Sequence, residues 1–422
     1  MKIDFLVKNC NELITLYGDS PRRGNSMSDL KIIKNGWLGS YRGRIVFIGT
    51  EEMFNERNFE IEKEAVIMDA EGKVCMPGLV DAHTHLPFGG ERKEEFKMKL
   101  DGVPYMELQK KGMGIKSTVK ATREVELKEL LNISQKRLDN MVKGGATTIE
   151  AKSGYGLDFD TEIKQLEVLR ILNEIHPVDI VSTYLGGHDI PPDKDKEVYL
   201  NELINNYIPE IANKKLAKFF DAFIEEGVYN GEETERMLIA AKKAGFLLKL
   251  HADEFTDKGG AALAVKYGAL SAEHLVKISK DGIEKMGNSS TAAVILPGVL
   301  FFLRGKDKPP VREMIEKGVI VALGSDYNPG SSHINSMFFI MRLSVFTEDF
   351  KIEEAITAAT INASYAIGLD KETGSLSPGK KTDLLILNIP SYIDIFYEPA
   401  INPIEYIIKE GEIILEKCEL KY

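Results

Sequence analysis

Two patterns of apolar and polar residues follow one another along the chain. Up to about residue 75, short runs typical of β-strands alternate with polar turns, and none of the runs has the length of an ordinary helix. These runs cover residues 3–7, 30–34, 43–48 and 66–69. From about residue 77 the pattern changes to a regular alternation of strand-like runs with segments whose apolar residues have helical spacing.

The alternation contains eight apolar strand runs, at residues 79–82, 146–149, 180–184, 217–220, 246–250, 269–272, 292–296 and 319–323. Helical spacing is clearest at 125–141 and 163–172. Eight strands alternating with helices predict an α/β fold, a (β/α)8 TIM-type barrel.

A last helical segment at 352–367 is followed by β-type runs at 384–387, 406–408 and 412–415. We therefore expect the barrel over residues 77–371. The two ends of the chain, 1–76 and 372–422, then form a small, discontinuous β-sandwich domain.

Composition narrows the class of protein. The 422 residues are 43% hydrophobic and 28% charged, which is typical of a folded domain and excludes disorder. A net charge of -11 argues against binding to nucleic acid or to anionic membranes. The three scattered cysteines, the absence of a signal-peptide pattern and the lack of any apolar run of about 20 residues predict a cytoplasmic protein.

The histidines indicate where the chemistry lies. Five of the seven histidines follow the ends of predicted strands: His83, His85, His188, His251 and His274. Asp326 follows the eighth predicted strand. In a (β/α)8 barrel these strand ends meet at one mouth, where active sites are built.

Four of these residues form a candidate metal site. His83 and His85 are two apart on a strand, so their side chains share one face. Taken alone, His251 reads as a core histidine and Asp326 as a turn or capping residue. Together the four offer three imidazoles and a carboxylate, a set suited to Zn, with Fe and Mn as alternatives. Such a site would lower the pKa of a water ligand to about 7.

Other side chains at the strand ends have two interpretations each. Glu254 is either a general base or an acid near the start of the next helix. His274 either polarises a carbonyl or moves a proton, and otherwise is a hydrogen-bonding residue at a strand end. His188 either binds substrate or has that same structural role.

Several motifs resemble known sequences. PGLVDAHTHL at 77–86 resembles the first-strand signature of the metal-dependent amidohydrolase superfamily, and residues 362–387 are similar to its C-terminal return into the β domain. Within it, HTHLPFGGERKEEF at 83–96, KSGYG at 152–156, residues 249–275 and DYNPGSS at 326–332 resemble the imidazolonepropionase family.

The resemblance implies hydrolysis of the cyclic amide C–N bond of 4-imidazolone-5-propanoate to N-formimidoyl-L-glutamate, a step of histidine degradation. It implies one metal ion, Zn before Fe, held by His83, His85, His251 and Asp326, because the fourth-strand segment KFFDAFIEEG does not end in the lysine typical of two-metal members. Catalytic roles fall on Glu254, His274 and Asp326, with the general base left open. Substrate contacts fall on eight residues: Arg92, Tyr105, Tyr155, His188, Glu254, Asn328, Gly330 and Ser331.

The charges of the protein and of the implied substrate bear on this interpretation. A carboxylate substrate approaching an acidic protein needs a local cation, which Arg92 can supply, unless Arg92 instead pairs with Glu94 or Glu95. Departures from the family motifs, such as Pro87 and the runs LGGHDIPP and SAEHL, change no ligand and affect only the shape of the mouth. The expected assembly is a homodimer.

Two alternatives remain. One is another mononuclear amidohydrolase, such as a nucleobase deaminase or a different cyclic amidase, for which a neutral substrate needs no carboxylate anchor. The other is a non-catalytic scaffold with the amidohydrolase fold, which the presence of all four ligands disfavours.

Overall fold

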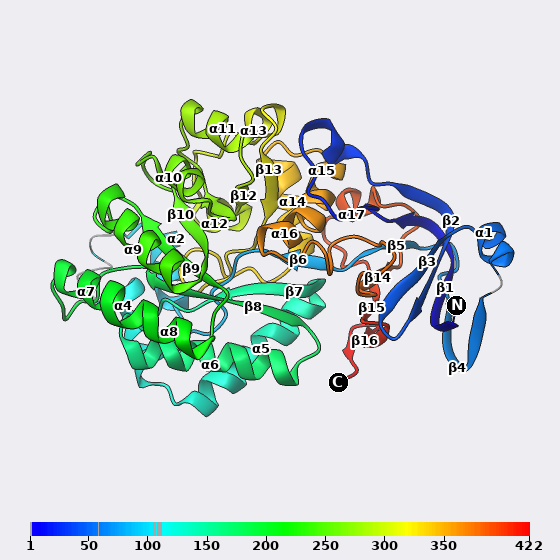
Figure 1. Ribbon diagram of the computed structural model, residues 1–422, viewed down its shortest axis with the longest axis horizontal. Coiled ribbons are helices and arrows are strands. Elements are labelled where there is room, and N and C mark those ends of the chain that lie inside the picture. The colour runs from blue at the N-terminus through cyan, green and yellow to red at the C-terminus, as the bar shows by residue number, and fades with distance from the viewer. Residues whose placement is uncertain (1, 58, 104–106, 108–111) are drawn as a thin grey trace.

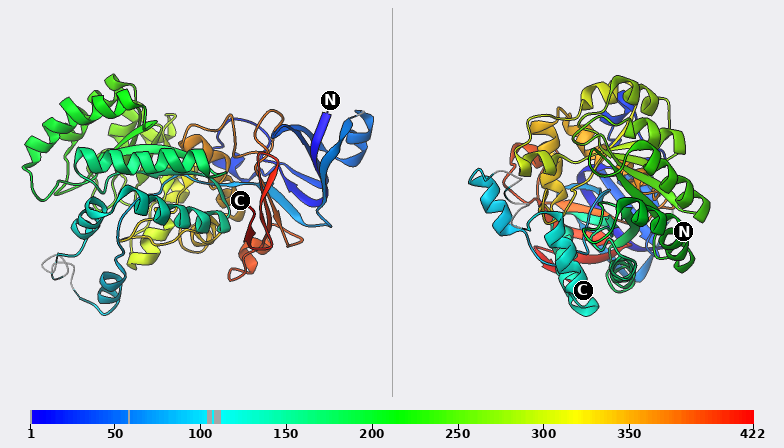
Figure 2. Two further views of the ribbon diagram at one scale, coloured as in Figure 1. Left: turned by 90° about the horizontal axis from the view of Figure 1, so that it is seen from below. Right: turned by 90° about the vertical axis from the view of Figure 1, so that its left-hand side faces the viewer.

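A computed structural model describes residues 2–57, 59–103, 107 and 112–422, and it contains a barrel and a separate mixed sheet (Figure 1). The sheet stands at one end of the barrel, as Figure 1 and the left view of Figure 2 show. Both labelled chain ends lie on the side of the sheet (Figure 1).

The barrel consists of eight parallel strands in the order β13-β12-β11-β10-β9-β8-β7-β6. Their bounds are β6 Leu79–Asp81, β7 Ala146–Lys152, β8 Asp179–Gly187, β9 Phe219–Ile224, β10 Leu247–Ala252, β11 Ser271–His274, β12 Ala292–Ile295 and β13 Ile320–Leu323. The barrel closes just beyond β6 and β13, where the Asp326 N–H donates to the His83 carbonyl at 2.9 Å and the His85 N–H donates to the Tyr327 carbonyl at 3.0 Å. The predicted barrel is confirmed, with β9 and β11 each beginning two residues later than expected.

Helices surround the barrel, and those that pack on it bury an apolar face. In α5, for example, Leu130, Leu138 and Met141 are buried. The helices between and after the strands are α2 Lys93–Leu100, α4 Ile115–Glu124, α5 Leu127–Lys143, α6 Phe159–Ile175, α7 Lys196–Glu202, α8 Ile208–Lys214, α9 Gly231–Ala244, α10 Gly260–Tyr267, α11 Lys280–Gly287, α12 Pro297–Leu303, α13 Val311–Glu316 and α14 Met337–Thr347. A π-helical turn, Leu203–Tyr207, joins α7 to α8.

The helical segment expected at 352–367 is divided into α15 Ile352–Ala358 and α16 Ile361–Ala366. Thr360 departs from helical geometry, with φ -129° and ψ -101°, and its hydroxyl donates to the Ile356 carbonyl at 2.6 Å. A threonine hydroxyl that bonds back to the preceding turn competes with the helical pattern.

The second sheet is built from both ends of the chain and has the order β17-β16-β15-β14-β5-β1-β2-β3, with β4 paired to β1. Its strands are β1 Lys2–Ile14, β2 Ile32–Tyr41, β3 Arg44–Gly49, β4 Glu60–Asp69, β5 Val74–Pro77, β14 Leu384–Leu387, β15 Ile404–Lys409, β16 Glu412–Glu416 and β17 Glu419–Leu420. The short helical elements nearby are Gly24–Ser28, α1 Glu51–Glu56 and α17 Asp394–Tyr397. The division at residues 76/77 and 371/372 stays a prediction.

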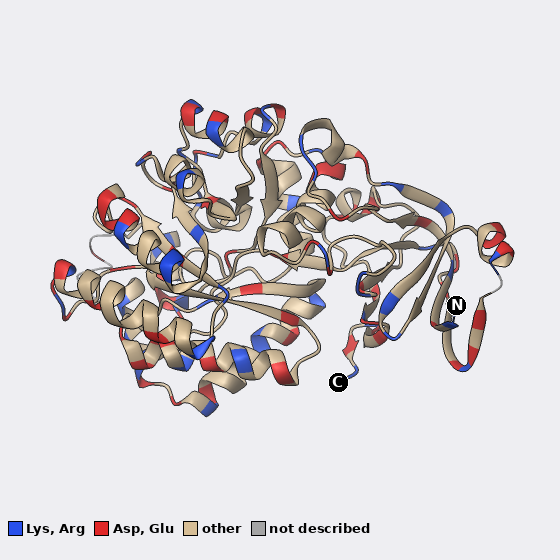
Figure 3. Cartoon of the chain, in the orientation of Figure 1, with Lys and Arg blue, Asp and Glu red and all other residues tan. Residues whose placement is uncertain are grey.

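Basic and acidic residues are interspersed along the outer helices (Figure 3). Within the described ranges, none of the helices is long and apolar enough to cross a bilayer.

Candidate active site

The HxH segment at the end of β6 brings two imidazoles and one carboxylate together. The Nε2 atoms of His83 and His85 are 3.3 Å apart, and each lies 3.2 Å from Oδ1 of Asp326. Two tetrahedral ligands at the usual Zn–N distance would be separated by about 3.3 Å. The three atoms are therefore spaced as ligands of one ion.

His251, at the end of β10, completes this group. Candidate ligand atoms of His83, His85 and His251 all lie within 4.8 Å of one another, and the three side chains are buried. Nε2 of His251 is shielded from solvent and has no hydrogen-bond partner among the residues that the structure describes. A buried polar nitrogen without a partner is costly, and a metal ion would satisfy it. The donor set thus fits a metal ion.

Asp326 lies in a tight loop that fixes its carboxylate. The side-chain amide of Asn328 donates to the backbone carbonyl of Asp326 at 2.7 Å and to its Oδ2 at 2.9 Å. Asp326 and His274 have left-handed backbone conformations, with φ of 50° and 74°. Such conformations cost about 1–3 kcal/mol each and cluster at functional sites. The main role of the Asn328 side chain is therefore to stabilise the conformation of this loop.

The charges at this group are strongly coupled. Burial alone would lower the pKa of His83, but the carboxylates of Glu273 and Asp326 raise it to about 9. Burial likewise opposes ionisation of Asp326, and His83 and His85 overcome it and hold its pKa well below the usual range. The pocket is thus set up for a cation beside the Asp326 carboxylate.

Behind the histidines lies a buried layer of charged side chains. Nζ of Lys152 is 2.8 Å from Oε1 of Glu150, 3.0 Å from Oδ2 of Asp221 and 3.0 Å from Oε2 of Glu273. The second lysine of this layer, Lys249, lies 2.6 Å from Oε1 of Glu273. All five side chains have no exposed surface.

Glu254 and His274 face each other across the mouth. Oε1 of Glu254 is 3.6 Å from Nδ1 of His274. Burial, with Asp326 and Glu225 nearby, raises the pKa of Glu254 well above its usual value, whereas burial lowers the pKa of His274 to about 3. The raised pKa makes the Glu254 carboxylate a stronger proton acceptor, and His274 stays neutral.

His188 and Tyr155 form one wall of the pocket. The His188 ring stacks on His85 with centroids 5.1 Å apart, and Tyr155 lies 5.2 Å from His188. Nδ1 of His188 is 2.8 Å from the Gly154 carbonyl, which can only accept, so Nδ1 carries the proton and Nε2 is an acceptor. Burial lowers the pKa of His188 to about 4, which keeps the ring neutral.

These walls enclose a cavity of about 570 Å³, lined in part by Arg92, Tyr155, His188, Glu254, Asn328, Gly330 and Ser331. Seven of the eight predicted substrate contacts therefore line one cavity; the eighth, Tyr105, lies outside the described residues. A smaller cavity of about 320 Å³ adjoins it, and Glu254 lines both.

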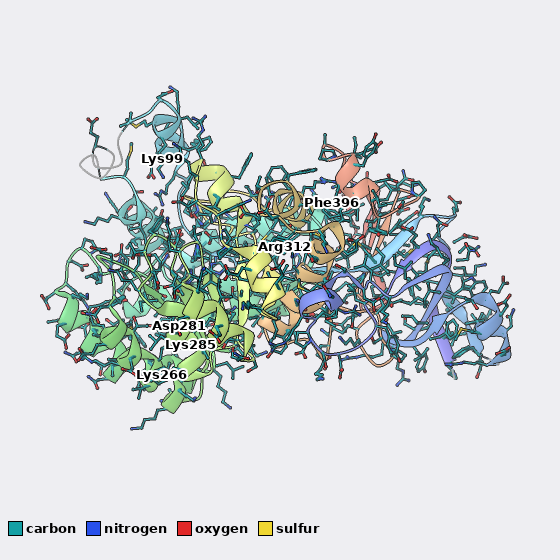
Figure 4. The ribbon with its side chains drawn as sticks, turned by 90° about the horizontal axis from the view of Figure 1, so that it is seen from above. Lys99, Lys266, Asp281, Lys285, Arg312 and Phe396 are labelled. Carbon is teal, nitrogen blue, oxygen red and sulfur yellow. The ribbon has the colours of Figure 1, made fainter. Side chains whose placement is uncertain are left out.

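Arg92 reaches this cavity while paired with Glu95. Its Nε is 2.9 Å and its Nη2 2.5 Å from the two carboxylate oxygens of Glu95. Lys99, labelled in Figure 4, lies 2.8 Å from the same carboxylate and also lines the cavity. Arg92 Nη1 points at Gly330, where a Cβ atom would lie 2.0 Å from it. Arg92 and Lys99 thus share one carboxylate at the rim, and the lining of the cavity also includes the acidic residues Asp189 and Glu254.

The buried charged residues that contact the candidate ligands are harder to predict from the sequence than the ligands themselves. Neither Asp221 nor Glu273 is a candidate on sequence grounds, because each sits in a short, mostly apolar strand run. The available signal is alternation: Glu150 and Lys152, Lys249 and His251, and Ser271 and Glu273 are pairs two apart on strands, so each pair shares a face.

Sequence comparisons agree with this geometry. The profile of the amidohydrolase family matches residues 74–415. The chain is 44% identical to the imidazolonepropionase of Geobacillus kaustophilus (strain HTA426), over 97% of both chains. It is 42% identical to the imidazolonepropionase of Clostridium tetani (strain Massachusetts / E88), over 99% of both chains.

Structural comparisons show the fold alone. An adenosine deaminase from Xanthomonas campestris, solved with bound zinc, aligns with a TM-score of 0.73 at 16% identity, covering 100% of this chain and 94% of that one. Guanine deaminase from E. coli aligns with a TM-score of 0.70 at 15% identity, covering 97% and 98%.

Proposed function

Because the chain belongs to the amidohydrolase family, and within it to the imidazolonepropionases, we propose that it hydrolyses 4-imidazolone-5-propanoate to N-formimidoyl-L-glutamate. The cyclic amide C–N bond next to the ring carbonyl is the bond that breaks. The observation that carries the proposal is the convergence of His83, His85 and Asp326, where the His85 ring contacts Tyr155 and His188 in the wall of the cavity that Arg92 also lines.

Cationic side chains at the rim of the cavity would compensate the negative charge of the substrate's propanoate group. Arg92 has one guanidinium edge committed to Glu95, and Nη1 remains on the side of Gly330 and the cavity. Nη1, with Lys99 beside it, would bind the propanoate group. Glu95 occupies only one edge of the Arg92 guanidinium, and a neutral nucleobase would have no carboxylate for the remaining edge, which favours the imidazolone substrate over a deaminase reaction.

His83, His85, His251 and Asp326 would hold the metal ion, Zn as the first choice and Fe as the alternative. A metal ion bound there supplies Lewis-acid activation of water and of the ring carbonyl. The ion is expected to be single, because the Lys152 ammonium already lies 3.0 Å from Asp221 and Glu273, two of the three residues that could hold a second ion.

The protein's own groups would move the protons. Glu254 lies on the cavity wall and is placed to accept a proton from the attacking water and to pass it to the leaving ring nitrogen. Neutral His274, 3.6 Å from Glu254, would donate to the developing oxyanion. Tyr155, His188 and Ser331 would orient the ring. Asn328 would act through Asp326, because its amide is already engaged within the loop.

The physiological setting follows from this reaction. The enzyme would act in histidine degradation on a small anionic substrate. We expect a cytoplasmic homodimer: Cys10, Cys75 and Cys418 are all free thiols, which suits a reducing compartment.

The test is turnover of freshly prepared 4-imidazolone-5-propanoate by the purified full-length protein, with identification of the product. We expect N-formimidoyl-L-glutamate, and loss of activity when the metal is removed by a chelator. Arg92→Ala should raise KM far more than it lowers kcat, because the anchor contacts the non-reacting end of the substrate.

Two outcomes would contradict the proposal. Release of ammonia from a nucleobase, with no turnover of the imidazolone, would indicate a deaminase. Glu254→Gln with near-native activity and unchanged metal content would show that Glu254 is not the proton-transfer group.

A further inference from the structure

Lys152 is the least expected residue in the centre of the barrel. It ends β7, its side chain has no exposed surface, and its ammonium lies within 3.0 Å of three carboxylates, those of Glu150, Asp221 and Glu273. An isolated ammonium in such a place would be very unfavourable, so the carboxylates must compensate it, and it must compensate them.

Two of these carboxylates contact proposed metal ligands. Asp221 accepts the backbone N–H of His251 at 3.2 Å, and its Oδ2 lies 2.9 Å from Nδ1 of the same residue. Oε2 of Glu273 lies 2.5 Å from Nδ1 of His83. In both cases the carboxylate contacts Nδ1 of the imidazole, and the proposed metal ligand is the other ring nitrogen, Nε2. Nε2 of His83 faces Asp326, and Nε2 of His251 has no hydrogen-bond partner among the described residues.

The same oxygen atoms contact both the histidines and Lys152. Oδ2 of Asp221 faces His251 Nδ1 and Lys152, and Oε2 of Glu273 faces His83 Nδ1 and Lys152. The ammonium therefore lies at the junction of two chains of contacts that end at two different ligands. Removing it would leave three buried carboxylates with one remaining buried lysine, Lys249, which lies on Oε1 of Glu273.

We propose that Lys152 is a positioning residue of the metal site: one buried ammonium holds Asp221 and Glu273 in the orientations that present Nε2 of His251 and of His83 to a single metal ion. The inference rests on the metal site proposed above. Lys152 does not touch the ion or the substrate. Its role is to keep two ligands from opposite parts of the barrel wall, β6 and β10, aimed at one point.

The test is the affinity of the full-length protein for Co²⁺, measured by competition with a chromophoric chelator and by the visible absorption of the bound ion. In Lys152→Met, which keeps the length of the side chain and removes its charge, we expect the Co²⁺ dissociation constant to rise about 10- to 100-fold, because Asp221 and Glu273, the outer partners of two ligands, lose the group that orients them. The Co²⁺ absorption bands should also shift, because the ligand geometry relaxes.

Lys249→Met is the matched control. Lys249 is equally buried and also pairs with Glu273, but on the oxygen away from His83. Both variants should lower the thermal unfolding temperature of the metal-free protein, whereas only Lys152→Met should weaken Co²⁺ binding strongly. A dissociation constant for Lys152→Met no higher than that of Lys249→Met would overturn the inference.

Two further measurements keep the test decisive. If Lys152→Met does not fold, Lys152→Gln, which removes the charge but keeps hydrogen-bond donors for the carboxylates, is compared with Lys249→Gln: a higher Co²⁺ dissociation constant for the Lys152 variant supports the inference, and an equal or lower one overturns it. The native protein separates the two proposals: if it fails to bind Co²⁺, the proposed metal site is wrong and this inference falls with it, whereas native-like binding by the Lys152 variants overturns the inference alone.

Discussion

The Glu95 side chain determines the orientation of its neighbour Arg92. It is 3% exposed and contacts Arg92, Lys99 and the backbone N–H of Gly114, which donates to it at 2.8 Å. Burial alone would raise the pKa of Glu95, but these donors lower it to about 2. A lowered pKa means that the stabilisation is present at neutral pH and is lost only as the pH falls from about 4.5 towards 2. Arg92 is therefore held in one orientation throughout the range in which the enzyme would be assayed.

Replacing Glu95 by Gln should weaken substrate binding. Without the charge, Arg92 can leave the cavity rim, and we expect KM to rise about tenfold, equivalent to about 1.4 kcal/mol, with kcat changed less than twofold. Steady-state kinetics at pH 7 measures both. Glu94→Gln is the control, because Glu94 is an exposed residue of the same helix. Equal KM values for the two variants would show that Glu95 does not position Arg92.

At the scale of elements, helix α6 fixes the loop that carries Tyr155. Asp158 caps the helix by accepting the Thr161 N–H at 2.8 Å. Glu162, in the first turn and fully buried, accepts the backbone N–H groups of Gly154, Gly156 and Leu157 at 2.8–2.9 Å. The loop after β7 thus obtains its shape from the helix that follows it.

Glu162→Ala should therefore affect both stability and binding. We expect the free energy of unfolding to fall by about 3 kcal/mol, because three buried N–H groups lose their carboxyl acceptor, and KM to rise because Tyr155 is no longer held. Denaturant unfolding and steady-state kinetics check the two effects. Glu174→Ala, on the exposed part of α6, should change stability by less than about 0.5 kcal/mol. A Glu162 variant as stable as this control would contradict the assignment.

The elements also show what the sequence can and cannot predict. The eight barrel strands follow from apolar runs, and the gathering of His83, His251 and Asp326 follows from the rule that parallel strand ends meet at one mouth. The sequence does not predict which charged residues contact one another inside the barrel. Lys152 and Asp221 are far apart in the chain, and the alternation of side chains along a strand predicts only the face on which each lies. The orientation of Arg92 is set by a loop contact that has no periodic signal.

The whole molecule has a core that continues from the barrel into the sheet. One cluster of buried apolar residues includes Met76 of β5 and Leu385 of β14 together with Leu138 of α5 and Leu169 of α6. A buried ion-pair network adds to it: Lys409 of β15 lies 2.6 Å from Asp179 of β8 and 2.7 Å from Asp383. Barrel and sheet are thus bound by both apolar and polar contacts.

We therefore expect the full chain to unfold in a single cooperative transition. Because the apolar cluster spans both parts, neither can lose its structure without exposing the core of the other. Scanning calorimetry, compared with circular dichroism at wavelengths that report strand and helix, measures this. Two separated transitions in the native protein would show that the barrel and the sheet are energetically independent.

The pairing of β1 with β5, and of β5 with β14, has a consequence for synthesis on the ribosome. β1 finds its partners β2, β4 and β5 within the first 77 residues, but β5 cannot pair with β14 until some 300 further residues have been translated. During this interval the β5 edge of the growing sheet has no partner strand. The nascent chain must therefore keep this edge from pairing with other chains, alone or with a chaperone, until the last strands arrive to extend the sheet.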